Sequence, residues 1–112
     1  MKPQAIKQYL YSGDYYSYRL ITSADGTVTT KQYVTAPEEV SMLIQTNIFG
    51  ELKIDSLYKM QRESILKNIK DKNNEEIYEN GVWEIIQSAP ILSPMGTKEG
   101  YQYIAILKSG DI

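Results

Sequence analysis

The chain of 112 residues contains no cysteine and no histidine. Without cysteine it can form neither a disulfide framework nor a thiolate metal site. Without histidine it lacks the usual general base, the commonest zinc ligand and the side chain that titrates most readily near neutral pH. No spacing among its carboxylates, lysines and hydroxyl groups indicates a catalytic site. We therefore expect a protein that is not an enzyme and that binds no cofactor and no metal ion.

Long hydrophobic runs are also missing. No run approaches the roughly 18–20 apolar residues that a membrane-spanning helix needs. The N-terminal residues 1–5 are not followed by an apolar stretch of signal-peptide length. We expect a soluble chain that is made in a cytoplasm and has no membrane partner.

An excess of basic residues is absent too. Lysine and arginine number 12 against 14 acidic residues, for a net charge of −2. A nucleic-acid-binding protein normally carries a basic patch that displaces counterions from phosphate. The nearest approach is Lys67, Lys70 and Lys72, and acidic residues lie among and after them, which is typical of a solvated turn. We expect no specific binding of DNA.

The unusual abundance is tyrosine, with ten residues against one phenylalanine and one tryptophan. Tyrosine favours strands, and it favours surfaces that become buried on association because its ring packs while its hydroxyl still finds a partner. Two interpretations stay open: ordinary strand residues at the rim of a small core, or an interface. Hydrophobic residues make up 42% of the chain, which suffices for one modest core. We expect a single domain over residues 1–112.

The N-terminal third predicts an arm over residues 1–13 and a tyrosine-rich hairpin over 14–35. Asp25-Gly26 supplies the turn, because glycine adopts positive φ without steric cost. Neither strand has a strongly apolar face. The hairpin is therefore expected to project from the body or to be covered by a partner.

The middle of the chain predicts two strands. Alternating apolar residues favour a strand over 40–47, and a second apolar stretch favours another over 64–69. An acid and a serine suited to capping favour a short helical turn over 55–62.

The C-terminal half carries the clearest pattern, an Asn-Gly hairpin over residues 76–86. A type I′ turn needs positive φ at both central positions, for which Asn80 and Gly81 are the preferred pair. This register sets Tyr78 opposite Trp83, with both side chains on the core face.

A loop rich in proline and glycine is expected over 88–100, followed by a closing strand over 101–108 that is apolar on both faces in its second half. The sum is a mainly β chain: a small antiparallel barrel or sandwich of five to six strands with one short helical segment and a barrel core over 40–108. The expected core residues are Ile44, Tyr78, Trp83, Ile85, Tyr103, Ile104 and Ile106.

From residue 40 onward the order of elements resembles the head-completion proteins of tailed bacteriophages, which are also called head-closure, stopper or head–tail connector proteins. The similar segments are the strand ending in Ile44-Gln45, the stretch Arg62–Ile65, the hairpin Glu76–Ile86 and the closing strand Gly100–Leu107. Trp83 stands where that family more often has tyrosine. The tyrosine-rich segment 9–35 has no counterpart in it.

The resemblance implies a structural virion protein of the phage neck, assembled in the cytoplasm of the bacterial host. It implies a homo-oligomeric ring between a portal or adaptor protein and the tail, which closes the DNA-filled head and offers a docking surface to tail proteins. DNA would pass through the ring without specific binding. The resemblance also implies a variable loop over 46–61, which would face the channel or a neighbouring subunit. The expected interface residues are Tyr15, Tyr16, Tyr18, Tyr33, Ile48, Phe49, Leu52 and Tyr58.

Two alternatives remain. One is a monomeric β-sheet binding module that recognises a peptide or glycan through the tyrosine-rich surface of hairpin 15–34. The other is a small enzyme or enzyme inhibitor of unrecognised type.

Overall fold

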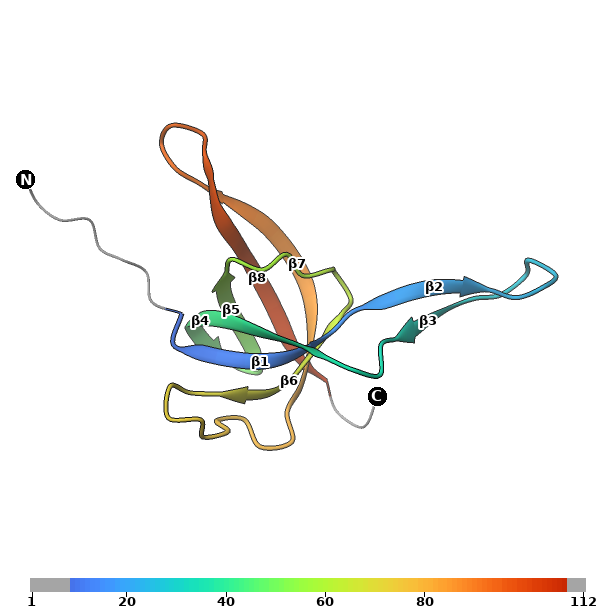
Figure 1. Cartoon of the computed structure of the whole chain (residues 1–112), viewed down its shortest axis with the longest axis horizontal. Coiled ribbons are helices and arrows are strands. Elements are labelled where there is room, and N and C mark those ends of the chain that lie inside the picture. Colours follow the sequence, from blue (N-terminus) through green and yellow to red (C-terminus); the bar gives the residue numbers. More distant parts are fainter. Residues whose placement is uncertain (1–8, 109–112) are drawn as a thin grey trace, which may run out of the picture.

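The computed structural model describes residues 9–108 and consists of strands, turns and bends. Six strands close into an antiparallel barrel in the order β1-β4-β5-β8-β7-β6, and two more form a separate two-stranded sheet (Figure 1). The strands are β1 (Tyr11–Tyr16), β2 (Tyr18–Thr22), β3 (Thr29–Tyr33), β4 (Glu38–Ile48), β5 (Glu51–Ser56), β6 (Ile65–Lys70), β7 (Val82–Leu92) and β8 (Lys98–Lys108). The predicted mainly β antiparallel barrel of five to six strands is confirmed, with six strands in the barrel and two more in the separate sheet.

The predicted helical segment is wrong. Residues 9–108 contain no helix, and so none that is long and apolar enough to cross a membrane. Strand β5 runs through residues 51–56, inside the segment predicted as a variable loop and helical turn. Leu52 and Ile54 alternate into the core with no exposed surface, and β4 and β8 pair with the two edges of the strand. The Ser56 hydroxyl donates to the backbone of β4 instead of capping a helix.

The predicted Asn-Gly hairpin over 76–86 is also wrong. Strand β7 pairs with β6 and β8, while residues 77–80 form bends and turns. Asn80 has a φ of 57°, but Gly81 is not in the positive-φ region that a type I′ turn requires. The predicted proximity of Tyr78 and Trp83 is nevertheless present, with ring centroids 5.1 Å apart in an edge-to-face arrangement. Strand β7 pairs with β6 and so completes the barrel. This long-range pairing outweighs the local turn signal.

Strands β7 and β8 form a longer hairpin than expected. Most of the predicted loop 88–100 is paired strand, and the turn spans only Ser93–Thr97, where the Ser93 N–H donates to the Thr97 carbonyl at 2.8 Å. A bulge lies between Ile85 and Gln87. Beyond it the hairpin leaves the barrel and projects as the orange loop at the top of Figure 1.

The N-terminal boundaries differ from those predicted. Residues 1–8 of the predicted N-terminal arm lie outside the described residues. Asp14–Tyr16, predicted to open the hairpin, belong to β1, which pairs with β4 and β6. The barrel therefore begins at Tyr11, before the segment 40–108 predicted as its core.

The core fills the barrel with side chains from every barrel strand. Its buried members are Tyr15, Val40, Met42, Leu52, Ile54, Met60, Leu66, Ile69, Trp83, Ile85, Tyr103 and Ala105. Ile44 and Tyr78 are partly buried and pack against this cluster. Ile104 and Ile106 are only half-buried, because Tyr103 and Ala105 take the inward positions of β8 and successive strand residues point to opposite faces. Their assignment to the core was wrong.

Candidate interaction surface

The most prominent surface is the hairpin formed by β2 and β3, residues 18–33, which we call the arm. It leaves the barrel and extends to the right in Figure 1. The arm and the β7–β8 hairpin make the molecule elongated, with extents of 63 × 34 × 26 Å. Every residue from 19 to 30 is exposed. The predicted projecting hairpin therefore exists, without the residues of β1.

The tip of the arm is built by local hydrogen bonds. Gly26 adopts a φ of 76° in the turn between the strands. The Asp25 carboxylate accepts hydrogen bonds from the hydroxyls of Ser23 at 2.6 Å and Thr27 at 2.8 Å and from the Thr27 N–H at 3.1 Å. These bonds favour the charged form and lower the pKa of Asp25 to about 2.

Apolar side chains are uncovered on both faces of the arm. The Val34 N–H donates to the Ser17 carbonyl at 3.0 Å, and the Ser23 N–H donates to the Val28 carbonyl at 2.8 Å. The alternation of an antiparallel pair then places Ile21, Val28 and Val34 on one face and Leu20 with the arm's tyrosines on the other. All four aliphatic side chains are exposed. No part of the described chain packs over them, so the surface is available to another molecule.

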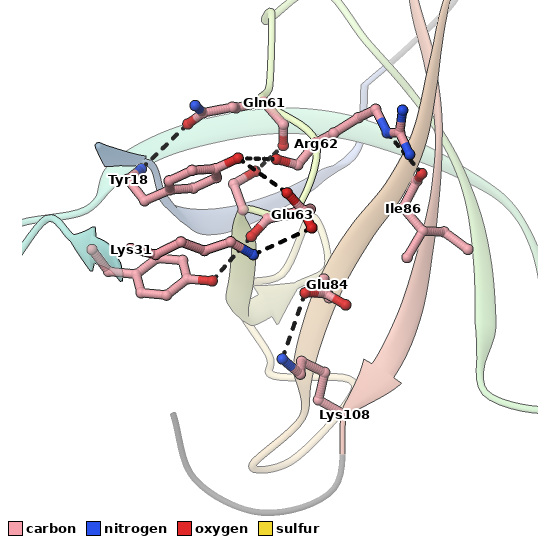
Figure 2. Close-up of polar contacts among 10 residues, drawn as sticks. Tyr18, Lys31, Gln61, Arg62, Glu63, Glu84, Ile86 and Lys108 are labelled. Carbon is pink, nitrogen blue, oxygen red and sulfur yellow. Dashed lines mark hydrogen bonds and ion pairs between the residues drawn. The ribbon is translucent and has the colours of Figure 1, made fainter. Parts of the chain in front are cut away.

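The base of the arm is fixed to residues 61–63 of the β5–β6 connection (Figure 2). The Tyr18 hydroxyl donates to the Arg62 carbonyl at 3.0 Å, and the Tyr33 hydroxyl donates to the Glu63 carbonyl at 3.0 Å. The Tyr18 N–H donates to the Gln61 side chain at 3.3 Å. The arm is therefore held to the barrel by hydrogen bonds from both of its strands.

A charged side chain reinforces this base. Lys31 Nζ lies 3.5 Å from Glu63 Oε1 and 5.1 Å from the centroid of the Tyr18 ring (Figure 2). The rings of Tyr18 and Tyr33 meet edge to face at 5.7 Å. Half-exposed contacts of this kind stabilise by about 1 kcal/mol or less each. Together with the backbone contacts they make the arm an ordered projection.

Tyrosine hydroxyls also fix the preceding part of the same connection. The N–H groups of Met60 and Gln61 donate to the hydroxyls of Tyr103 and Tyr15, each at 2.7 Å. The Tyr103 hydroxyl in turn donates to the Tyr58 carbonyl at 2.7 Å. Backbone groups outside regular structure need such partners when they are buried. The hydroxyls of four tyrosines thus form hydrogen bonds with the backbone of the irregular segment 58–63, namely Tyr15, Tyr18, Tyr33 and Tyr103. This accounts for part of the tyrosine excess.

An open groove lies where the arm joins the barrel. It is lined by residues 17–19 and 32–36 and has a volume of about 600 Å³; we call it the arm-base groove. Val34 is 41% exposed in it. The Arg19 guanidinium bonds to the Gln32 side chain at 3.2 and 3.3 Å. Within residues 9–108 no ion pair joins Arg19 to an acidic side chain.

A second exposed apolar surface surrounds the β4–β5 turn. Phe49 is fully exposed and has a φ of 51°, an uncommon conformation for a residue with a β-carbon. Its neighbour Ile48 is 57% exposed. The Leu107 N–H donates to the Gly50 carbonyl at 2.8 Å, which brings the half-exposed Leu107 side chain to the same end of the barrel. Exposed Met95 and Leu92 form a third apolar surface at the tip of the β7–β8 hairpin.

The predicted interface residues fall into three groups. Ile48, Phe49 and Tyr58 are exposed. Tyr16, Tyr18 and Tyr33 are half-buried; the last two form the arm's base, and the first lies beneath Lys67 with Nζ 5.3 Å from its ring.

The prediction that Tyr15 and Leu52 lie at an interface is wrong, because both are buried in the core. Each points inward from a barrel strand, and Tyr15 also accepts the hydrogen bond from Gln61. Sequence reasoning missed residues 61–63 as the seat of the arm. Their role depends on contacts with residues 30 or more positions away in the sequence, for which the sequence carries no local signal.

The described residues show little that could perform chemistry. Residues 9–108 contain no cluster of three or more acidic side chains that could hold a metal ion. The buried Asp55 carboxylate accepts a hydrogen bond from the Gln45 amide at 2.5 Å. Burial raises the pKa of Tyr103 to about 12, and its hydroxyl is engaged by the backbone. The hydrogen bonds of Asp55 and Tyr103 therefore hold parts of the fold together.

Comparison of the chain with protein-family models, with curated proteins and with solved structures finds no match.

Proposed function

We propose that the chain is a structural protein of a tailed bacteriophage, which forms a ring between portal and tail, closes the DNA-filled head and provides the tail's docking surface. The observation that carries this proposal is the ordered arm on a closed barrel, with apolar side chains uncovered on both faces. The resemblance of residues 40–108 to head-completion proteins is a second support.

The distribution of exposed apolar groups favours an assembly protein. Single exposed hydrophobic residues are ordinary, but an arm uncovered on both faces gains stability when a partner buries it. A two-stranded hairpin is only marginally stable alone. Here its base is tied to the barrel by two tyrosine hydroxyls, so the arm is already ordered before any partner binds. Less conformational entropy is then lost on association.

A ring also needs two different surfaces on each subunit, since its contacts are heterologous. The arm and the β4–β5 turn are such a pair. The net charge of −2 suits a channel through which DNA moves, because a basic lining would retain the phosphate backbone. Non-enzymatic action and location in the neck of the virion are parts of the same proposal.

The alternative is a monomeric module that binds a peptide or glycan, and the exposed arm favours it equally. Its predicted tyrosine surface is smaller than expected, since Tyr15 is buried and the hydroxyls of Tyr18 and Tyr33 bond to the chain's own backbone. The ring is therefore the better-supported proposal.

Deletion of the gene from the phage that encodes the chain tests the proposal. We expect heads that lose their packaged DNA and tails that remain unattached, both visible by electron microscopy, with infectivity restored by the wild-type gene in trans. Normal yields of tailed, infectious particles from the deletion phage would refute the proposed function.

A further inference from the structure

Two surfaces of the molecule carry complementary features, each with an apolar group beside a charge and the two charges of opposite sign. The β4–β5 turn presents the fully exposed Phe49, followed by the exposed carboxylate of Glu51. Among residues 9–108 no ion pair engages Glu51. The turn therefore offers an aromatic side chain and a negative charge with no partner in the described chain.

The arm-base groove offers the matching features. Arg19 lies at its wall, and within residues 9–108 its guanidinium bonds to a neutral amide and to no acidic side chain. Val34 and Ala36 supply apolar surface. An arginine guanidinium attracts both a carboxylate and the face of an aromatic ring. Aromatic residues and arginine are also the types that dominate the energetic centres of protein interfaces.

The two surfaces cannot meet within one molecule. Strand β4 connects them directly, beginning two residues after Ala36 and ending at Ile48, next to Phe49. Its 11 residues form a strand on the order of 30 Å long at ~3.3 Å per residue. The turn and the groove therefore lie at opposite ends of the same strand.

We propose that the β4–β5 turn of one copy docks into the arm-base groove of the next copy. Phe49 inserts beside Val34, and Glu51 pairs with Arg19 across the contact. Because the turn and the groove are different surfaces, the contact is heterologous and repeats from copy to copy, which generates a closed ring or an open filament. This inference rests on the proposed ring and names the contact that builds it.

Charge exchange tests the contact in the full-length chain. Sedimentation velocity at increasing concentration should show wild-type self-association, and Arg19→Glu and Glu51→Arg should each weaken it roughly tenfold or more. The double variant, with the charges exchanged, should recover most of the loss. Phe49→Ser should abolish association. Met95→Ser at the β7–β8 tip should not change it, although Met95 is also a highly exposed apolar residue. Circular dichroism of each variant verifies folding.

Cross-linking provides a second test, since the chain has no native cysteine. Oxidation of the Arg19→Cys, Glu51→Cys double variant should give a ladder of disulfide-linked multimers on non-reducing gels. The Arg19→Cys, Met95→Cys control should give none above the dimers seen with single variants.

A wild-type chain that stays monomeric at all concentrations, a charge-exchanged variant that recovers nothing, or equal ladders from both cysteine pairs would overturn the inference. The gene deletion judges the proposed function separately. Loss of head closure on deletion, combined with unaffected association in the variants, would retain the ring and reject this contact.

Discussion

At the scale of single residues, the tyrosines explain how the barrel holds the irregular segment 58–63 in place. The hydroxyl of Tyr103 bridges the Met60 N–H and the Tyr58 carbonyl, and its ring is 1% exposed in the core. One side chain thus links the barrel interior to the connection that seats the arm. Tyr101 stacks against it at 6.1 Å, and no hydrogen bond of its hydroxyl occurs among the described residues.

Replacing Tyr103 by phenylalanine should therefore destabilise the fold while Tyr101→Phe does not. Loss of the hydroxyl leaves the Met60 N–H buried without an acceptor, which costs about 1–3 kcal/mol. Urea denaturation of both variants measures this difference. Equal unfolding free energies for the two variants would show that the bridge contributes nothing to stability.

The same phenol predicts a dependence on alkaline pH. Burial raises the pKa of Tyr103 from 10.0 to about 12 in the folded chain. Below pH 10 the phenol is neutral in both states. Between pH 10 and 12 it ionises first in the unfolded chain, so folding loses roughly 2–3 kcal/mol over this window. Denaturation of wild type and Tyr103→Phe from pH 9 to 12 isolates the effect, because the other tyrosines are common to both. Parallel pH profiles would contradict it.

At the scale of elements, local chemistry could be predicted and long-range pairing could not. The arm was predictable because its turn lies within the segment, with Asp25 and Gly26 between two strand-forming stretches. The closing strand was predictable from its apolar residues. Its inward face was assigned wrongly at Ile104 and Ile106, because a strand that is apolar on both sides carries no alternation to read.

Strand β5 and the Asn-Gly segment failed for a different reason. The short strand Glu51–Ser56 gains its stability from β4 and β8 on either side, so its own residues carry an ambiguous signal. Asn80-Gly81 favours a hairpin locally, yet β7 gains more by pairing with β6 and closing the barrel. Tertiary pairing overrode local propensity in both cases.

The arm's attachment gives a prediction at this scale. Tyr33→Phe removes the hydrogen bond to the Glu63 carbonyl, so the arm should open more often while the barrel stays intact. Hydrogen exchange followed by mass spectrometry should show faster exchange in peptides covering residues 19–33 and unchanged exchange in β5 and β8. Tyr16→Phe is the matched control, because no hydrogen bond of its hydroxyl is found in the described chain. Unchanged exchange in the arm would mean that this hydroxyl does not hold it.

At the scale of the whole molecule, a closed barrel carries an ordered arm and, across the length of β4, an exposed aromatic turn. A barrel that pairs its own strands leaves association to its projections. The arm, the arm-base groove and the β4–β5 turn suit a subunit that contacts its neighbours head to tail. Two different contact surfaces are what a ring component needs, whereas a module that binds a single ligand needs one.

The central claim is that copies of this chain form a ring between portal and tail. Cryo-electron microscopy of the neck of the phage in which the proposal places this chain tests it most directly. The account predicts a ring of this barrel beneath the portal, with the β4–β5 turn of each subunit against the arm base of the next. A neck whose density is filled entirely by other proteins would contradict it.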